Sequence, residues 1–289
     1  MDTIPILFPD DWKDYELIDS GEGYKLERFS SYMITRPDPR AIWSKANPDF
    51  WKDADAIHKR NDATSSGQWK IIKPPPTPWG VHYRDVTFAL RLTEFKHVGV
   101  FPEQAVNWYW IEQQISGRAI TVLNLFGYTG GATLFAAKAG AMVTHVDSAR
   151  SAISWAKENA QKSGLSDKPI RWIEDDAYKF VVREGRRGST YDAIIMDPPR
   201  FGRGAKGEVW KIEKDLPKLL DAALFILSKS PQFFLVNAYT ADLSTIALYN
   251  IVATKLRKLG GSLTYGELAL EERESKRLLP NGIFVRWNR

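Results

Sequence analysis

The sequence predicts an α/β fold built on a mostly parallel sheet of seven strands with helices on both faces, preceded by a small β-rich domain. Short apolar runs alternate with helical patterns from residue 119 onward, and residues 12–95 instead show short alternating runs rich in tryptophan and proline. The 289 residues suffice for two domains. We expect a β-rich domain over 1–95, a linking segment with a helix over 96–118, and the α/β domain over 119–289.

The linking segment contains an unusual sequence before its helix. Residues 96–104 combine a glycine and a proline with the adjacent side chains Glu103 and Gln104, which suggests a functional loop. A plain linker between domains explains the same composition equally well. The pattern of Asn107–Gln114 then predicts a helix that leads into the first strand of the sheet.

A strand, a glycine-rich turn, a helix and a second strand are predicted over Thr121–Asp147. The first strand is the apolar run 122–125, the helix covers 132–141, and the second strand covers 142–146. Glycines allow the turn to approach a ligand closely, and the helix that follows presents unpaired N–H groups. This pattern indicates one βαβ unit.

Asp147 ends the second strand of this unit, where a carboxylate can accept hydrogen bonds from both hydroxyls of a ribose. We therefore expect a ligand that contains adenosine, although an ordinary βαβ corner would also need glycines. Gly127-Tyr128-Thr129-Gly130-Gly131 lacks the Gly-x-Gly-x-x-Gly pattern of dinucleotide sites, which disfavours NAD without excluding it.

Carboxylates follow the third predicted strand. A helix over Ala149–Ser163 precedes the strand Ile170–Ile173, and the strand is followed by Asp176 and Ala177 in the sequence Glu-Asp-Asp-Ala. At the carboxyl end of a strand these groups can bind an amino group such as that of adenine. Asp176 is also a suitable N-cap for a helix over Tyr178–Arg183, and both roles are compatible.

The fourth predicted strand, Tyr191–Met196, ends in Asp197-Pro198-Pro199-Arg200-Phe201. Two prolines stiffen the loop and lack N–H groups, so nearby carbonyl oxygens stay free as acceptors. Asp197 and such carbonyls can accept protons from an amino group of a planar substrate, and Phe201 can stack on its ring. A strand terminator with a packed phenylalanine is the structural alternative.

The rest of the chain completes the sheet. Helices are predicted over Trp210–Leu227 and Leu243–Leu259, and strands over Phe233–Ala238, Ser262–Leu270 and Gly282–Trp287.

Composition narrows the chemistry. The chain has no cysteine, which removes disulfides, thiolate metal sites and cysteine nucleophiles, and its four histidines are scattered, so no metal site is expected. No stretch is apolar enough to span a membrane and no signal peptide is apparent, so we expect a soluble cytoplasmic protein. The oligomeric state, monomer or homodimer, is not predicted.

The net charge of +5 is a modest sign of a polyanionic partner, although a solvated charged surface is an equally good explanation. Basic residues cluster after the third and fourth strands: Arg183, Arg186, Arg187, Arg200, Arg203, Lys206, Lys211 and Lys214.

These motifs, in this order, resemble the Rossmann-like class I S-adenosylmethionine-dependent methyltransferases, and more narrowly the bacterial branch that includes large-subunit ribosomal RNA methyltransferases. The matching motifs are Asn124-Leu-Phe-Gly127-Tyr-Thr-Gly130, Val146-Asp147-Ser148, Ala156-x-x-Asn159, Asp176-Ala177 and Asp197-Pro-Pro-x-Phe201. Tyr15–Trp43 and His97-x-Gly99-x-Phe101-Pro-Glu-Gln104 also resemble the small domain and the cofactor-covering segment of that branch.

The resemblance implies S-adenosyl-L-methionine (AdoMet) as cofactor. Its implied binding residues are Gln104, Asn124, Phe126, Gly127, Tyr128, Thr129, Gly130, Asp147, Ser148, Asp176, Ala177 and Asp197. Asp197, Pro198, Pro199 and Phe201 are the implied catalytic residues, which face the transferred methyl group and the target.

The lack of cysteine separates this chain from relatives that methylate a pyrimidine C5 atom through a cysteine adduct near the fifth strand. The expected target is therefore a base nitrogen of RNA, with a purine preferred and ribosomal RNA as the expected partner. Methylation of a protein side chain or a small molecule is an alternative, as is a non-catalytic RNA-binding protein that keeps the fold. A nicotinamide-dependent dehydrogenase is a fourth and much weaker hypothesis.

Overall fold

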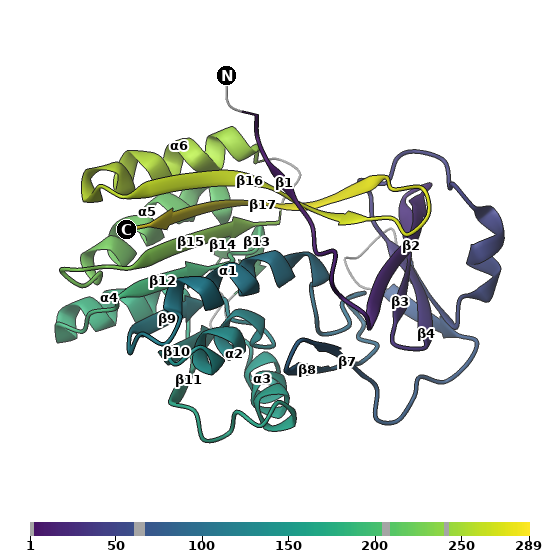
Figure 1. Cartoon of the computed structure of the whole chain (residues 1–289), viewed down its shortest axis with the longest axis horizontal. Coiled ribbons are helices and arrows are strands. Elements are labelled where there is room, and N and C mark those ends of the chain that lie inside the picture. Colours follow the sequence, from purple (N-terminus) through teal and green to yellow (C-terminus); the bar gives the residue numbers. More distant parts are fainter. Residues whose placement is uncertain (1–2, 61–66, 204–208, 240–242) are drawn as a thin grey trace. The chain divides into compact units, whose positions relative to one another are not determined.

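The computed structural model describes residues 3–60, 67–203, 209–239 and 243–289 (Figure 1). These residues form two compact units. Unit 1 contains Met1–Leu7, Val106–Leu268 and Asn281–Arg289, and unit 2 contains Phe8–Ala105 and Ala269–Pro280. The segment 269–280 thus belongs to the same unit as residues 8–105, from which it is distant in sequence.

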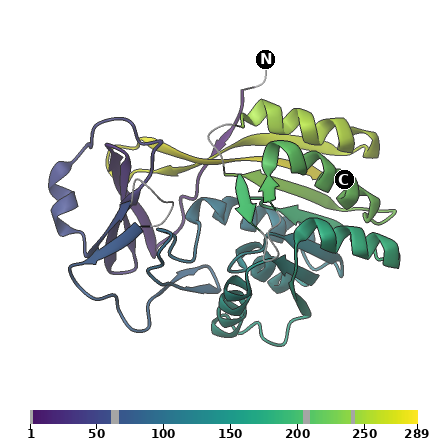
Figure 2. The same cartoon turned by 180° about the vertical axis from the view of Figure 1, so that it is seen from behind.

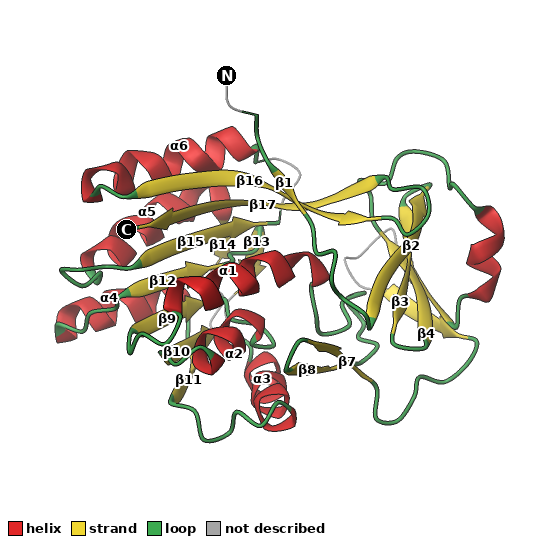
Figure 3. Ribbon diagram, viewed as in Figure 1, coloured by secondary structure: helices red, strands yellow, loops and turns green. Residues whose placement is uncertain are grey.

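Unit 1 is built on a sheet of eight strands in the order β1-β16-β17-β15-β12-β9-β10-β11, shown as arrows in Figure 3. In chain order the strands are β1 (Ile6–Leu7), β9 (Thr121–Leu125), β10 (Met142–Asp147), β11 (Ile170–Glu174), β12 (Ala193–Met196), β15 (Phe233–Ala238), β16 (Ser262–Glu271) and β17 (Leu278–Asn288). The sheet has one strand more than expected, because the two-residue β1 adds to its edge.

The sheet is mostly parallel. Strand β9 lies at its centre and pairs in parallel with both β10 and β12, while β11 and β15 extend the parallel part on either side. Strand β17 pairs antiparallel with β15. Strand β1 pairs in parallel with β16 at the edge through only two residues, too short for a sequence pattern to reveal. The α/β fold class predicted from the sequence is confirmed.

Helices cover both faces of the sheet. Figure 1 shows α1, α2 and α3 on one face, and Figure 2, seen from behind, shows the others. The helices are α1 (Ala105–Ile115), α2 (Gly131–Lys138), α3 (Arg150–Lys162), α4 (Ala177–Arg187), α5 (Ile212–Phe225) and α6 (Thr245–Leu256), and α6 is followed by a 3-10 turn, η3 (Arg257–Leu259). No helix of the described chain is both long and apolar enough to cross a membrane.

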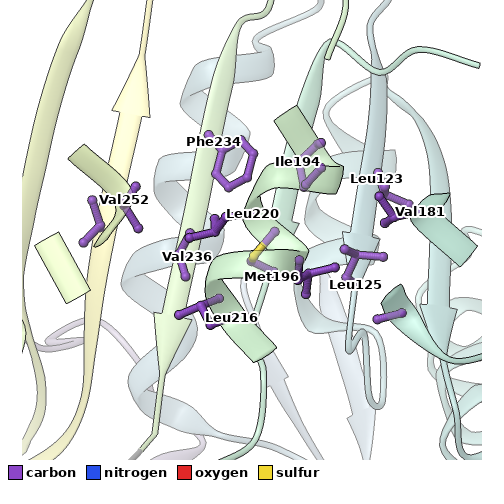
Figure 4. Packing of buried hydrophobic residues seen from close by; sticks show 14 of the residues in the cluster. Leu123, Leu125, Val181, Ile194, Met196, Leu216, Leu220, Phe234, Val236 and Val252 are labelled. Carbon is purple, nitrogen blue, oxygen red and sulfur yellow. The ribbon is translucent and has the colours of Figure 1, made fainter. Parts of the chain in front are cut away.

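Alternation along the central strands builds a core on each face. Leu123 and Leu125 of β9 pack with α4, α5 and α6 (Figure 4), whereas Val122 packs on the other face with α1 and α2. Side chains two residues apart on a strand point to the same face. Because β12 and β15 are buried on both faces, their sequences are apolar at every position except Asn237 of β15.

Unit 2 contains a five-stranded sheet and a two-stranded hairpin. The sheet has the order β2 (Tyr15–Gly21), β3 (Tyr24–Phe29), β4 (Tyr32–Pro37), β5 (Ala56–Arg60) and β6 (Gly67–Ile71), and the hairpin joins β7 (Gly80–Tyr83) to β8 (Val86–Ala89). Two 3-10 turns, η1 (Pro48–Asp53) and η2 (Pro102–Gln104), complete the unit.

The late segment 269–280 is bonded into unit 2. Glu272 is fully buried, and its Oε1 accepts a hydrogen bond of 3.0 Å from the backbone N–H of Ser20. Arg277 donates to Asp19 at 2.9 Å and to the other carboxylate oxygen of Glu272 at 2.8 Å. A buried carboxylate is tolerated because such partners replace water.

A hairpin replaces part of an expected helix. The sequence pattern predicts a helix that begins at Trp210, but Trp210 lies in β14 (Val209–Lys211), which pairs antiparallel with β13 (Phe201–Arg203). Helix α5 begins at Ile212, where Asp215 in its first turn accepts a hydrogen bond of 2.9 Å from the N–H of Lys211. The prediction was wrong here because the alternation Val-Trp-Lys was read as helical.

Candidate active site

Four segments expected to form the site follow neighbouring strands of unit 1. The carboxyl ends of β9, β10, β11 and β12 lie at one edge of the sheet, because these strands are parallel and adjacent. Ligands of open α/β sheets bind at this edge. The segments 126–130, 147–148, 175–177 and 197–201 therefore begin there.

The turn after β9 has an unusual backbone. Phe126, Tyr128 and Gly130 have φ angles of 58°, 48° and 93°, in the left-handed region that only glycine adopts without cost. Hydrogen bonds hold the turn: the N–H of Gly127 donates to Val146 at 3.0 Å, and the buried Asn159 donates to the carbonyl of Thr129 at 2.9 Å. Alternating backbone conformations of this kind direct N–H groups to one side of a turn.

Asp147 is fixed by the same turn. Its Oδ2 accepts a hydrogen bond of 2.9 Å from the N–H of Tyr128, and its Oδ1 accepts one of 2.8 Å from the N–H of Ala149. Each carboxylate oxygen has capacity for a further hydrogen bond. Burial raises the pKa of Asp147, although these backbone N–H groups oppose the shift. The side chain therefore fits the pair of hydroxyls expected from the sequence.

A buried polar chain lies beneath the turn. Asn124 donates to the hydroxyl of Thr133 at 2.8 Å, and this hydroxyl lies 2.9 Å from Nδ1 of His145. The His145 ring packs on Trp172 at 4.9 Å between centroids, and its Nε2 has no hydrogen-bond partner in the described structure. Sequence analysis assigned His145 no role, since its place under the turn depends on strand register.

We expect His145 to make folding stability depend on pH. Burial lowers its pKa to about 3, whereas an unfolded histidine titrates near ~6.5. Below that value the unfolded state binds a proton that the folded state does not, so acidification destabilises the fold. Between pH ~7 and ~5 the wild type should lose about 2 kcal/mol more unfolding free energy than His145→Asn, as measured by urea titration. Equal losses in both proteins would contradict this prediction.

Asp176 and Ala177 lie where the sequence placed them, after β11. Asp176 is the N-cap of α4, and its Oδ1 accepts a hydrogen bond of 2.9 Å from the N–H of Lys179. The capping role proposed from the sequence is confirmed. The neighbouring Asp175 pairs with Arg183 and donates its N–H to the carbonyl of Asp147 at 3.0 Å, which ties the two strand ends together.

The loop after β12 lies beside the glycine turn. The N–H of Asp197 donates to the carbonyl of Leu125 at 3.4 Å, so the two loops leave the sheet side by side. Asp197 is half-buried, Pro198 is buried and Pro199 is exposed. The carbonyl of Pro199 already accepts a hydrogen bond of 2.6 Å from the indole N–H of Trp210.

Trp210 is a site residue that sequence reasoning missed. Its ring packs on Phe126 of the glycine turn at 5.2 Å between centroids, so it joins the β13–β14 hairpin to both loops. Phe201, at the start of this hairpin, is 51% exposed, which leaves its ring available for stacking. An alternating reading of residues 201–203 and 209–211 would have indicated the hairpin.

Ser148 and Gln104 complete the set of expected residues. Ser148 is exposed after β10, and its backbone N–H hydrogen-bonds to the carboxylate of Asp147. Gln104 belongs to unit 2, at the end of η2, where its N–H donates to the carbonyl of Phe101 at 3.1 Å.

The basic residues after β11 and β12 are partly neutralised. Arg183 pairs with Asp175, and Arg187 pairs with the buried Glu184 at 3.0 Å. Lys206 lies outside the described residues. Among the residues placed in the structure, no group of three or more His, Cys, Asp or Glu side chains has metal-site geometry.

Comparisons with known proteins identify the family of this chain. Residues 51–231 match the family model of S-adenosylmethionine-dependent methyltransferases. A crystal structure of the SAM-dependent methyltransferase from Agrobacterium tumefaciens is 44% identical, with a TM-score of 0.93 over 98% of this chain and 93% of that one. The structure of SMU.776 with bound SAH shares the fold at 19% identity, with a TM-score of 0.72 over 95% of this chain and 75% of that one.

A curated relative adds a narrower similarity. The ribosomal RNA large subunit methyltransferase K/L of Shewanella baltica is 31% identical over 174 residues, which cover 58% of this chain and 24% of that protein. The chain thus matches only about a quarter of the relative's length. Since the family model covers more than half of the chain, the protein belongs to the S-adenosylmethionine-dependent methyltransferases, enzymes that transfer a methyl group from AdoMet.

Proposed function

We propose that the enzyme methylates a nitrogen atom of a base in RNA, with a purine preferred and ribosomal RNA as the substrate. The observation that carries the proposal is the placement of Asp197 beside the glycine turn, joined through its N–H to Leu125. The carboxylate of Asp197 accepts a proton from the target amino group, while the stiff Pro198-Pro199 segment holds its position.

The cofactor supplies a methyl group on a sulfonium sulfur, a donor that a nitrogen nucleophile attacks directly. In this proposal the Asp147 carboxylate accepts hydrogen bonds from the ribose hydroxyls, Asp176 and Ala177 contact adenine, and the turn 126–130 surrounds the methionine part. Such in-line displacement depends mainly on positioning and charge placement. The buried chain beneath the turn supports the required rigidity.

The absence of cysteine supports a nitrogen target. Methylation of a pyrimidine C5 atom proceeds through a nucleophile that adds to the ring, and this sequence has no cysteine to supply it. An amino or ring nitrogen is already nucleophilic, so it needs a proton acceptor such as Asp197 rather than a covalent partner.

RNA is favoured by the curated relatives and by charge. Relatives at 30–31% identity are named as large-subunit ribosomal RNA methyltransferases. Arg200 and Lys211 add positive charge in the segment that follows the carboxyl end of β12. Phosphate contacts of this kind make association with RNA weaken steeply with salt.

The proposal is tested by incubating the purified protein with methyl-labelled AdoMet and unmodified ribosomal RNA, followed by mass spectrometry of the nucleosides. A labelled N-methylated purine is the expected product. Methyl transfer to a protein or a small molecule, with none to RNA, would show that RNA is not the substrate. A protein that binds AdoMet and RNA but transfers nothing to any of these acceptors would point to a non-catalytic binding role.

Asp147→Ala should weaken AdoMet binding at least about tenfold, because two hydrogen bonds to a carboxylate are lost. Isothermal titration calorimetry measures the affinity, and the melting temperature shows whether the fold survives. Asp192→Ala removes a carboxylate that bonds Thr121 at the opposite end of β12, so it should leave the affinity unchanged. Unchanged affinity in Asp147→Ala would refute the assignment of the ribose contact.

A further inference from the structure

A buried arginine in unit 1 has no carboxylate partner. Arg286 of β17 is only 7% exposed, and its guanidinium donates to neutral oxygens of α1, the side-chain oxygen of Asn107 and the carbonyl of Val106. Within the described chain it forms no ion pair. Phe284 and Trp110 lie against it, with ring centroids 4.4 and 5.1 Å from its central carbon.

The charge of Arg286 is kept at a cost in stability. Burial lowers its pKa to about 10, so the group remains protonated near neutral pH. A buried charge without a counter-charge destabilises a fold, and an apolar side chain of similar size would avoid this cost. The positive charge therefore indicates a function other than packing.

Arg286 fixes the orientation of two buried amides. It donates twice to Oδ1 of Asn107, at 3.0 and 2.6 Å, and because a guanidinium cannot accept a hydrogen bond, this oxygen must face it. The NH2 group of Asn107 is then directed at Asn237 of β15, whose Oδ1 accepts its hydrogen bond at 2.9 Å. The group of Asn237 that faces away from Asn107 is thus its NH2 group, which can only donate.

Asn237 follows the same register as the proposed proton acceptor. Strands β12 and β15 pair in parallel with Met196 opposite Val236, so the next residues, Asp197 and Asn237, are level on neighbouring strands about 4.8 Å apart. The side chain of Asn237 is on the α1 side of the sheet, as is that of Ile195, two residues before Asp197. A hydrogen-bond donor at this position suits a carboxylate, whereas an oxygen would repel it.

We propose that Asn237 is a positioning residue for Asp197. Its NH2 group donates to the carboxylate of Asp197 and directs it at the target nitrogen. Arg286 keeps the amide of Asn237 in this donating orientation through Asn107. Hydrogen bonds to a carboxylate also favour its charged form, which is the form that accepts a proton. The inference rests on the proposed function, since it needs Asp197 as the proton acceptor.

The test removes the fixed orientation without a change of shape. Asn107→Asp gives Arg286 a carboxylate partner, so the variant should be at least as stable as the wild type in urea titration. It also removes the donor to Asn237, whose amide can then turn its NH2 group towards the new carboxylate and its oxygen towards Asp197. Activity and stability should therefore change in different directions, which a merely structural role would not produce.

Asn107→Asp should slow single-turnover methyl transfer to ribosomal RNA about tenfold at saturating AdoMet, because a hydrogen bond to a charged group is lost. Calorimetry should give the wild-type AdoMet affinity. In the background of Asn237→Ala, which removes the amide itself, Asn107→Asp should have no further effect on the rate. Asn250→Asp, at an exposed position of α6, adds the same charge and should match the wild type.

A normal rate in Asn107→Asp would overturn the inference. A slower rate that comes with weaker AdoMet binding or lower stability, or that persists in the Asn237→Ala background, would also overturn it. If Asp197→Asn transfers at the normal rate, or if the wild type does not methylate RNA, the proposed function fails and the inference fails with it. Slow transfer in Asp197→Asn with a normal rate in Asn107→Asp overturns the inference alone.

Discussion

Asp197→Asn is expected to lower the rate of methyl transfer by about 10²–10³-fold while AdoMet binds with nearly normal affinity. The amide keeps the shape of the side chain but cannot take a proton from the target nitrogen. Single-turnover transfer to RNA measures the rate of the chemical step, and calorimetry measures the affinity.

Asp192→Asn is the matched control because Asp192 lies at the opposite end of β12. Its carboxylate accepts hydrogen bonds of 2.9 Å from the N–H and the hydroxyl of Thr121, far from the loop of Asp197 along the strand. The control should transfer methyl groups at the wild-type rate. A normal rate in Asp197→Asn would remove Asp197 from the catalytic residues.

Gly127→Ala is expected to abolish measurable AdoMet binding. A Cβ at this position would lie 2.5 Å from Nδ1 of His145, well inside van der Waals contact. The His145 ring cannot move away easily, because Thr133 and Trp172 hold it on other sides. Overpacking of this kind costs about 1–3 kcal/mol, and here the displaced element is the glycine turn that we propose binds the cofactor.

A double-mutant cycle separates this clash from general damage. Removing the ring in Gly127→Ala/His145→Ala makes room for the new methyl group, so AdoMet affinity should recover in part relative to Gly127→Ala. His145→Ala alone gives the cost of losing the ring. Strict additivity of the two substitutions would show that the clash with His145 is not the cause.

Much of unit 1 could be predicted because its signals are local. One short stretch of sequence contains the apolar run of β9, the glycines at 127 and 130, and Asp147 at the end of β10. The structure of each of these features depends on neighbouring residues in the sequence. The parallel arrangement then follows from alternation of strands and helices, which brings Asp197 to the same edge.

The remaining features depend on distant partners and could not be predicted. Ile6–Leu7 become a strand only because Glu267 and Leu268 offer a free edge, and two residues show no period. Trp210 was assigned to a helix because the strand that contains it is only three residues long, too short to show a clear alternation of side chains. Its partner in the hairpin, Gly202, lies eight residues earlier in the sequence. His145 lies under the glycine turn through the register of β10 with β9.

The bonding of Glu272 and Arg277 to Ser20 and Asp19 has a consequence during synthesis on the ribosome. Phe8–Ala105 of unit 2 are translated before the central α/β region, but they lack these partners until residues 269–280 are made. The backbone N–H of Ser20 and the carboxylate of Asp19 must wait in a partly formed unit while all of the central α/β region is translated. A late folding step therefore follows the synthesis of residues 269–280, and shortening the chain after Leu268 should leave the sheet of unit 2 incomplete even though every one of its own strands is present.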